Sequence, residues 1–194
     1  QLGFIPIALD VSLNTLNVMS ENLTECIETE SLDALFLTNI LGFAGDLNNI
    51  REICNKENVV LLEDNCESLG CRLPEAKAGN FSLMSSFSFF VSHHMSTIEG
   101  GMVCTDDQEL ADMLRIVRAN GWARDASEEK KAELKDKYNI SKFNSPYSFF
   151  DLGFNLRPTE ITGFLGICQM EYLESALNTR RENYLKLEQI IKNN

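Results

Sequence analysis

The sequence has only two histidines, His93 and His94, and they are adjacent, directly after a run of apolar and hydroxyl residues. An imidazole has a pKa near neutrality, so it can move protons in a reaction. Hydroxyl side chains and free backbone N–H groups around the pair suit a phosphate. The surrounding hydroxyl residues are Ser88, Ser92, Ser96 and Thr97. A turn that packs its rings, followed by a plain Gly100-Gly101 connection, fits the same residues, so both interpretations stay open. Two histidines without a nearby cysteine disfavour zinc.

A second candidate site follows the apolar run 59–62, where Glu63, Asp64 and Glu67 occur close together. Open parallel α/β sheets bind their ligands at the carboxyl ends of the strands. A carboxylate at that place could hold a cationic ligand atom, such as a protonated pyridine nitrogen. Acidic residues at strand ends are also common as caps and loop residues, and this alternative stays open.

Short apolar runs alternate with segments of helical periodicity and must position these groups. The predicted strands are 4–9, 34–38, 59–62, 84–90 and 101–104. Asp46 is expected to cap a helix with apolar residues on one face, and a second helix is expected to run from about 108 towards Asn120-Gly121. Strands that are apolar throughout and alternate with helices predict an α/β fold with a mainly parallel sheet.

The second half of the chain differs in composition. Residues 124–146 form a polar insertion with charges of both signs, which we interpret as a solvated loop or surface helix. Pro158 is expected to open a helix at its first turn. Its predicted buried face consists of Ile161, Phe164, Leu165, Cys168 and Leu173. A separate amphipathic helix is predicted at about 175–192.

Composition excludes several classes of protein. The 194 residues include 17 Lys and Arg against 29 Asp and Glu, a net charge of −12. Nucleic acids and anionic membranes need clustered cations, so neither is an expected partner. No apolar run approaches the roughly 20 residues of a membrane span. The six cysteines form no CxxC pattern, so we expect neither a metal site nor a disulfide framework. These features favour a cytoplasmic location.

Several short motifs, taken together, resemble the DegT/DnrJ/StrS family of sugar aminotransferases. The motifs are Gly42-Phe43-Ala44-Gly45-Asp46, Glu63-Asp64, Gly79-Asn80-Phe81, Phe87-Ser88-Phe89, Thr97-Ile98-Glu99-Gly100-Gly101 and Gly153-Phe154-Asn155-Leu156-Arg157. The resemblance implies a pyridoxal 5'-phosphate (PLP) enzyme of fold type I, of which residues 1–194 would form part of the large domain. An N-terminal phosphate loop and a C-terminal small domain would be missing from this piece.

The resemblance also implies roles for individual residues. Asp64 would pair with the pyridine nitrogen of the cofactor, and Ser88 would bind its phosphate. Asn155 would reach the phosphate of a neighbouring subunit, which implies a homodimer. Glu67 falls near the cofactor ring, where relatives usually have glutamine or histidine.

One departure from the family pattern decides the expected chemistry. In the family, three residues follow Phe-Ser-Phe and the next residue is a lysine, which bonds covalently to the cofactor. His93 stands at that position, and no lysine occurs between Lys77 and Lys130. A branch of the family with this exchange resembles the chain: the 3-dehydratases of nucleotide-linked 4-keto-6-deoxyhexoses, which use pyridoxamine 5'-phosphate (PMP). The resemblance implies that His93 is the catalytic base, with His94 and Glu99 as candidate supporting residues.

Two versions of this branch exist, and one of them carries a [2Fe–2S] cluster on closely spaced cysteines after the segment equivalent to 120–125. No cysteine follows that segment here before Cys168. The cluster version is therefore disfavoured. The other version regenerates PMP with glutamate as amino donor, and we favour it because the chain resembles its members that act on GDP-4-keto-6-deoxymannose in lipopolysaccharide O-antigen biosynthesis. A non-catalytic relative that binds nucleotide sugar and a nucleotide-sugar 4-aminotransferase remain as alternatives.

Overall fold

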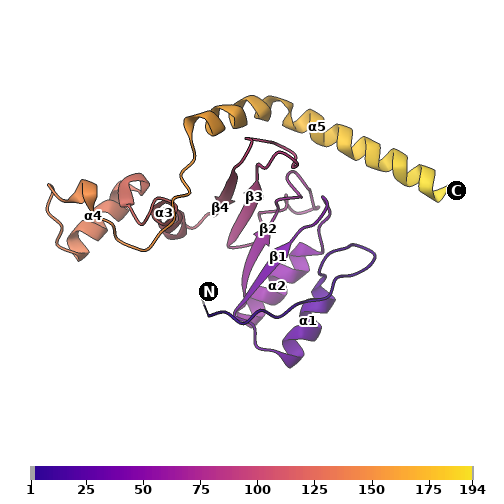
Figure 1. Ribbon diagram of the computed structural model, residues 1–194. Coiled ribbons are helices and arrows are strands. Elements are labelled where there is room, and N and C mark those ends of the chain that lie inside the picture. Colours follow the sequence, from indigo (N-terminus) through magenta and orange to yellow (C-terminus); the bar gives the residue numbers. More distant parts are fainter. Residues whose placement is uncertain (1–2, 194) are drawn as a thin grey trace. The chain divides into compact units, whose positions relative to one another are not determined.

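A four-stranded sheet organises the first of two units in the computed structural model, which describes residues 3–193 (Figure 1). This unit contains the chain up to Cys104 and again from Ile161, and the second unit is Thr105–Glu160. The strands are β1 (Ala34–Thr38), β2 (Val60–Asp64), β3 (Met84–Ser88) and β4 (Gly101–Cys104), in that order across the sheet. The first three are parallel and β4 is antiparallel to β3, which confirms the predicted α/β fold with its mainly parallel sheet.

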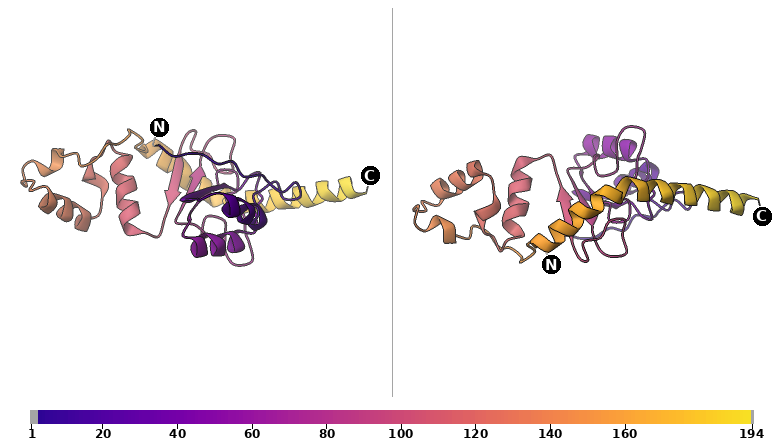
Figure 2. Two further views of the ribbon diagram at one scale, coloured as in Figure 1. Left: turned by 90° about the horizontal axis from the view of Figure 1, so that it is seen from below. Right: turned by 90° about the horizontal axis from the view of Figure 1, so that it is seen from above.

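Two helices, α1 (Ser20–Thr29) and α2 (Leu47–Glu57), lie on the same side of the sheet (Figures 1 and 2). Alternate strand residues point towards these helices and form the core of the unit. The core includes Leu35, Leu37 and Leu61 from the strands and Leu23, Leu47, Ile50 and Cys54 from the helices. Helix α1 is absent from the sequence-based prediction, although Leu23 is fully buried.

The predicted strand at 4–9 is wrong. Residues 4–9 have no strand pairing in the described structure, and the side chains of Phe4 and Ile5 are 78% and 88% exposed. Apolar, extended residues form a strand only when a neighbouring strand accepts their hydrogen bonds, and Pro6 has no N–H to donate.

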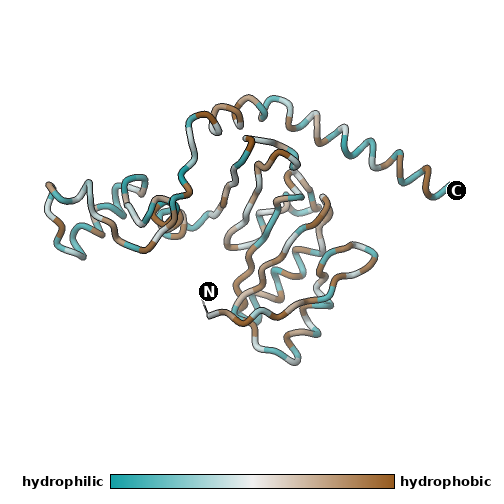
Figure 3. The backbone as a smooth tube through the Cα atoms, viewed as in Figure 1, coloured by the Kyte–Doolittle hydropathy of each residue, from teal (hydrophilic) through white to brown (hydrophobic). Residues whose placement is uncertain are grey.

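One continuous helix, α5 (Glu160–Lys192), replaces the two helices predicted for the C-terminal part. It begins two residues after Pro158, and no further proline interrupts it. None of its residues is buried, so the predicted burial of its apolar face is also wrong: Ile161 and Phe164 are 69% and 66% exposed. Apolar residues recur along this helix in Figure 3, but the spacing alone does not say what covers them.

The second unit contains α3 (Gln108–Val117), α4 (Glu128–Lys137) and the short 3₁₀ helices η1 (Ala123–Asp125) and η2 (Ser145–Tyr147). The predicted surface helix is present within 124–146: Glu128–Lys137 form α4, and Leu134 is its buried residue. A small core joins α3, η1 and α4 through Ile116, Ala123, Ala126 and Leu134.

A buried carboxylate links the first and second helices of this unit. The Asp112 side chain on α3 accepts hydrogen bonds from the backbone N–H and the hydroxyl of Ser127, at 2.7 and 2.6 Å, just before α4. Gln108 and Arg115 donate to the same carboxylate. Burial opposes ionisation, but these donors outweigh it and lower the pKa of Asp112 to about 2.

No helix of the described chain is both long and apolar enough to cross a membrane.

Candidate active site

The carboxyl ends of β1, β2 and β3 lead into three loops that lie at one end of the sheet, and α5 passes along this end (Figure 1). Each loop has a contact with the helix. Phe43 and Tyr184 meet edge to face with ring centroids 5.7 Å apart, and the N–H of Ser96 donates to the Gln169 side chain at 3.3 Å. Between them, Lys77 lies 4.0 Å from Glu174. The helix therefore fixes the loops from which the candidate residues come.

Asp64, the last residue of β2, projects from the sheet face opposite the α1–α2 core. Its Oδ1 accepts from the Ser86 hydroxyl on the adjacent strand and from the backbone N–H of Cys66, both at 3.0 Å. The pKa of the Cys66 thiol is raised to about 11 by burial first, and then by its hydrogen bond to Asp64. A carboxylate can accept about four hydrogen bonds, so Asp64 is oriented by these groups and keeps capacity for a further donor.

Ser88 ends β3 on the same face of the sheet. It lies two residues beyond Ser86, which pairs with Asp64 in the β2–β3 register, and strand side chains two apart share a face. The Ser88 hydroxyl accepts from the N–H of Phe90 at 3.2 Å and is half-buried. The structure thus brings Asp64 and Ser88 together at the end of neighbouring strands, as the parallel-sheet rule predicts.

The histidine pair lies on the loop between β3 and β4, and the loop is closed at its base. The N–H of Phe89 donates to Gly100 O, and the N–H of Thr97 donates to Phe89 O, both at 2.9 Å. Gly100 has a φ of +156°, and a Cβ there would lie 2.5 Å from the Thr97 hydroxyl. Part of the Gly-Gly motif is therefore needed for close approach within this loop.

Both histidines carry a buried ring nitrogen that lacks a partner. The Nδ1 atoms of His93 and His94 are inaccessible to solvent and accept or donate no hydrogen bond within residues 3–193. The His93 ring packs edge to face on Phe90, with centroids 5.8 Å apart. Leaving a buried polar atom unpaired costs about 1–3 kcal/mol, so these two nitrogens are candidates for a hydrogen bond to a bound group.

The pKa of His94 differs from that of a free histidine because of burial and charged neighbours. Burial lowers the pKa of His94, and electrostatic repulsion from the Arg180 guanidinium on α5 and from the adjacent His93 ring lowers it further, while Glu67 acts in the opposite direction. These influences favour the neutral form of the His94 ring. Glu67 is held in place because its Oε2 accepts from the N–H of Leu41 at 2.8 Å, in the loop after β1. Arg180 was not predicted, because no sequence spacing links it to a histidine so far away along the chain.

Glu63, next to Asp64, is buried and serves a different purpose. It points to the core side of the sheet and accepts from the N–H groups of Gly79 and Phe81, at 2.8 and 3.0 Å, and from the Asn39 amide at 3.2 Å. It thereby anchors the Gly79-Asn80-Phe81 motif. A Cβ on Gly79 would lie 2.7 Å from the Phe87 ring, and its φ of +94° also favours glycine.

Two predicted residues are not brought to this cluster by the described contacts. The Glu99 side chain is exposed, and its backbone oxygen accepts from the Thr97 hydroxyl at 2.8 Å. Asn155 belongs to the second unit, where its backbone pairs with Ala119. The roles of both residues remain predictions.

The residues at the carboxyl ends of β2 and β3 fit a pyridoxal-type cofactor. An oriented carboxylate with spare acceptor capacity suits a pyridine N–H, a strand-end hydroxyl suits a phosphate, and the unpaired histidine nitrogens are available to a polar group. In residues 3–193, no three His, Cys, Asp or Glu side chains gather in an arrangement that could hold a metal ion.

The α/β fold and the residues at the carboxyl ends of its strands define a protein of the type I class of pyridoxal-dependent enzymes. The chain belongs to the DegT/DnrJ/EryC1/StrS aminotransferase family, whose model matches residues 1–194. It is 38% identical over 175 residues to the GDP-4-keto-6-deoxy-D-mannose 3-dehydratase of Escherichia coli O55:H7. That match covers 90% of this chain and 44% of the relative.

Solved structures agree with this assignment. A variant of GDP-4-keto-6-deoxymannose-3-dehydratase with bound GDP-perosamine matches with a TM-score of 0.85 and 35% identity, over 96% of this chain and 47% of that one. The same type of enzyme with a trapped PLP-glutamate geminal diamine matches with a TM-score of 0.69 and 36% identity, over 86% and 42% of the two chains. The chain therefore spans less than half the length of these relatives.

Proposed function

We propose that the protein removes the C3 hydroxyl of a nucleotide-linked 4-keto-6-deoxyhexose, with PMP as cofactor and His93 as the catalytic base. The observation that carries this proposal is the histidine at the family's lysine position, with a buried ring nitrogen that has no partner in the described structure. The relatives described above, which are 3-dehydratases of a GDP-linked 4-keto-6-deoxymannose, support the same reaction class.

The chain's own residues would divide the work as follows. Asp64, oriented by Ser86 and Cys66, would hold the pyridine nitrogen and keep it protonated. Ser88 would bind the phosphate. When bound, the cofactor supplies an amine for the sugar ketone and a ring that accepts electrons. His93 would remove the proton that starts the elimination, since imidazole is a base suited to neutral pH.

The absence of lysine at position 93 also limits the alternatives. Imidazole forms no stable Schiff base with an aldehyde, so the covalent resting state of an ordinary transaminase is not supported. The nearest preceding lysine, Lys77, is directed to Glu174 on α5. Burial and Arg180 lower the pKa of His94, which disfavours a second positive charge next to the base.

Further parts of the proposal follow from the relatives and the family resemblance. Glutamate would be the amino donor that regenerates PMP, as the structure with a trapped PLP-glutamate species suggests. A homodimer would allow Asn155 to reach the phosphate of a neighbouring subunit. The protein would act in the cytoplasm, in the synthesis of deoxysugars for lipopolysaccharide O-antigen.

The product from the full-length protein tests the proposal. The protein would be given PMP, glutamate and GDP-4-keto-6-deoxymannose, and the sugar product would be analysed by mass spectrometry. A sugar that has lost the C3 oxygen and kept a carbonyl supports dehydration. A sugar with an amine in place of the ketone would show a 4-aminotransferase, and unchanged sugar would favour a non-catalytic binding protein.

A further inference from the structure

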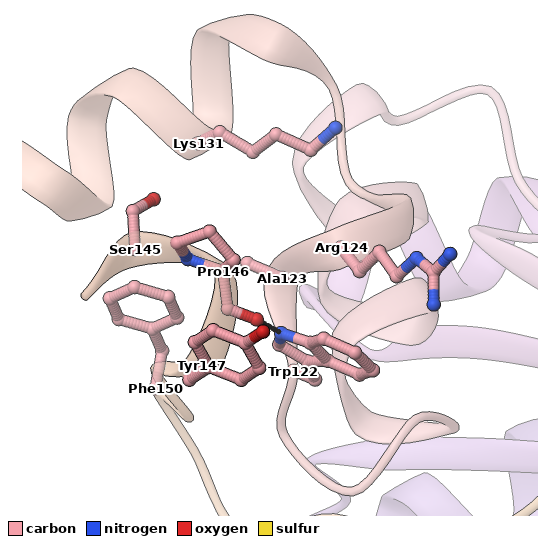
Figure 4. A pocket seen from close by; sticks show the side chains of 8 residues that line it. All are labelled: Trp122, Ala123, Arg124, Lys131, Ser145, Pro146, Tyr147 and Phe150. Atoms are coloured by element: carbon pink, nitrogen blue, oxygen red, sulfur yellow. Dashed lines mark hydrogen bonds between the residues drawn. The ribbon is translucent and has the colours of Figure 1, made fainter. Parts of the chain in front are cut away.

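Single side chains join distant segments in both units. In the second unit, the indole N–H of Trp122 donates to the Pro146 carbonyl at 2.8 Å, beside a cavity of about 450 Å³ (Figure 4). That side chain is half-buried and joins two segments by this one bond. In the first unit, Asn39 follows β1 directly and is fully buried. It makes several such bonds at the end of the sheet where Asp64 lies.

The side-chain amide of Asn39 bonds to both sequence neighbours of Asp64. Its Nδ2 donates to Asn65 Oδ1 at 2.8 Å and to Glu63 Oε2 at 3.2 Å. An amide NH₂ carries two hydrogens, so it can serve both acceptors. Glu63 and Asn65 are buried on the core side of the sheet, whereas Asp64 points the other way. One donor group therefore holds the residues on either side of Asp64, from the face that Asp64 does not use.

The backbone of Asn39 is tied to the same segment. Its N–H donates to Asp64 O at 2.9 Å, which continues the pairing of β1 with β2 beyond the last residue of β1. Its carbonyl accepts from the hydroxyl of Ser68 at 2.6 Å, and the N–H of Ser68 donates to Asn65 O at 3.0 Å. Ser68 is also fully buried. The segment after β1 and the segment after β2 are thus joined at several points around one asparagine.

Asp64 is consequently constrained from both faces of the sheet. On its own side, Oδ1 accepts from the Ser86 hydroxyl and from the N–H of Cys66, both at 3.0 Å. These donors set the rotation of the carboxylate. The place from which the carboxylate projects is set by the backbone of residues 63–65, which Asn39 holds. A carboxylate that must meet one nitrogen of a planar ring needs both constraints, because binding groups tolerate displacements of only about 0.5 Å.

We propose that Asn39 is a positioning residue for the cofactor and that it acts through Asp64. Its amide fixes the direction in which the Asp64 carboxylate leaves β2. Loss of the amide lets residues 63–65 shift and weakens the contact between Asp64 and the pyridine nitrogen, although every group on the cofactor side of the sheet is still present. The inference rests on the role proposed for Asp64, and it concerns cofactor binding rather than dehydration.

A double-mutant cycle on PLP affinity tests this proposal in the full-length protein. Asn39→Ala alone is expected to weaken PLP binding by about threefold or more, the size typical of residues coupled through one hydrogen-bond network. In the Asp64→Asn background the same change should weaken it by less than about twofold, because the charged contact that Asn39 positions is already lost. Cofactor absorbance during titration gives the four affinities. Asn49→Ala, which truncates an exposed asparagine on α2, is the matched control and should leave PLP affinity unchanged.

A milder variant serves if Asn39→Ala does not fold. Ser68→Ala removes only the hydroxyl that holds the Asn39 carbonyl. It should weaken PLP binding by a smaller factor than Asn39→Ala, and again only in the background that keeps Asp64. Circular dichroism verifies that each variant is folded.

The outcomes separate this inference from the proposed reaction. Unchanged PLP affinity in folded Asn39→Ala, or in Ser68→Ala if only that variant folds, would overturn the inference. An equal loss in both backgrounds would also overturn it, because Asn39 would then act on the fold and not through Asp64. If Asp64→Asn alone leaves PLP affinity unchanged, the roles of Asp64 and Asn39 both fail. Coupling between the two positions in a protein that does not dehydrate its sugar would leave this inference standing and refute the reaction.

Discussion

Two neighbouring carboxylates at the end of β2 are in opposite situations. Glu63 faces the core side and is buried, with two backbone N–H groups and one amide bonded to it. Asp64 faces the other side, is half-buried, and keeps acceptor capacity beyond its bonds to Ser86 and Cys66. One residue step along a strand thus separates a group that holds loops together from one that can bind a ligand. At this point of the sheet, the carboxylate on the core side has its hydrogen bonds filled by the protein, and the carboxylate on the other side can accept a further one.

The largest stability effect is expected on the Glu63 side. Glu63→Ala leaves the N–H groups of Gly79 and Phe81 without their acceptor in a buried place, so the free energy of unfolding should fall by about 3–5 kcal/mol. Urea unfolding of the variant measures this. Glu25→Ala, which removes an exposed carboxylate on α1, is the control and should change stability by less than about 0.5 kcal/mol. Equal stability of the two variants would show that Glu63 is not an anchor.

Asp64→Asn should separate binding from stability. The amide keeps the size of the carboxylate but not its charge, so PLP should bind at least tenfold more weakly while the unfolding free energy changes by under about 1 kcal/mol. Cofactor absorbance during titration of the full-length protein reports the affinity. Unchanged PLP affinity would remove Asp64 from the proposed cofactor site.

A pH-dependent effect is expected in the second unit. The pKa of Asp112 is about 2 when folded and about 3.9 when unfolded, so its contribution is present above pH 4 and is lost as the pH falls towards 2. Asp112→Asn should therefore lower stability by about 1–2 kcal/mol at pH 7. The deficit should shrink below pH 4 in thermal unfolding curves. Asp106→Asn, at an exposed carboxylate, is the matched control, and a deficit that stays constant down to pH 2 would contradict the prediction.

The smallest effect concerns the thiol beside Asp64. Burial and the carboxylate raise the pKa of Cys66 to about 11, so alkylation by iodoacetamide should be slow at pH 8 and faster as the pH approaches 11. Asp64→Asn removes one cause of the shift, and Cys66 should then react a few-fold faster at pH 8. Mass spectrometry of the labelled peptide gives both rates. If the rates were equal, the carboxylate would have no influence on the thiol.

The sequence was sufficient for the part of the fold in which local signals and tertiary contacts agree. The apolar run followed by acidic residues correctly predicted that Asp64 lies at the carboxyl end of a parallel strand. Ser88 was expected inside the strand 84–90, whereas β3 ends at Ser88. The strand at 4–9 failed, because composition cannot say whether a neighbouring strand is present. The buried face predicted on α5 failed for a related reason: periodicity shows that a face is apolar, not what lies against it.

Other features of the site depend on contacts that no motif encodes. Arg180 approaches His94 only because α5 runs past the loop after β3. The role of Glu63 depends on which of two adjacent residues points inward, and that is set by the strand register. Alternation in β2, with Leu61 buried and Glu63 two residues later, is the sequence signal that could have identified it.

The most direct test of the account is the rate of C3 dehydration by full-length His93→Asn, measured beside the unaltered protein with PMP bound to both. Mass spectrometry of the nucleotide sugar gives the rate, and cofactor absorbance verifies that PMP is retained. The account predicts a loss of about 10²–10⁴-fold, the usual contribution of a general base, with PMP affinity unchanged. Dehydration at the unaltered rate would show that His93 is not the base.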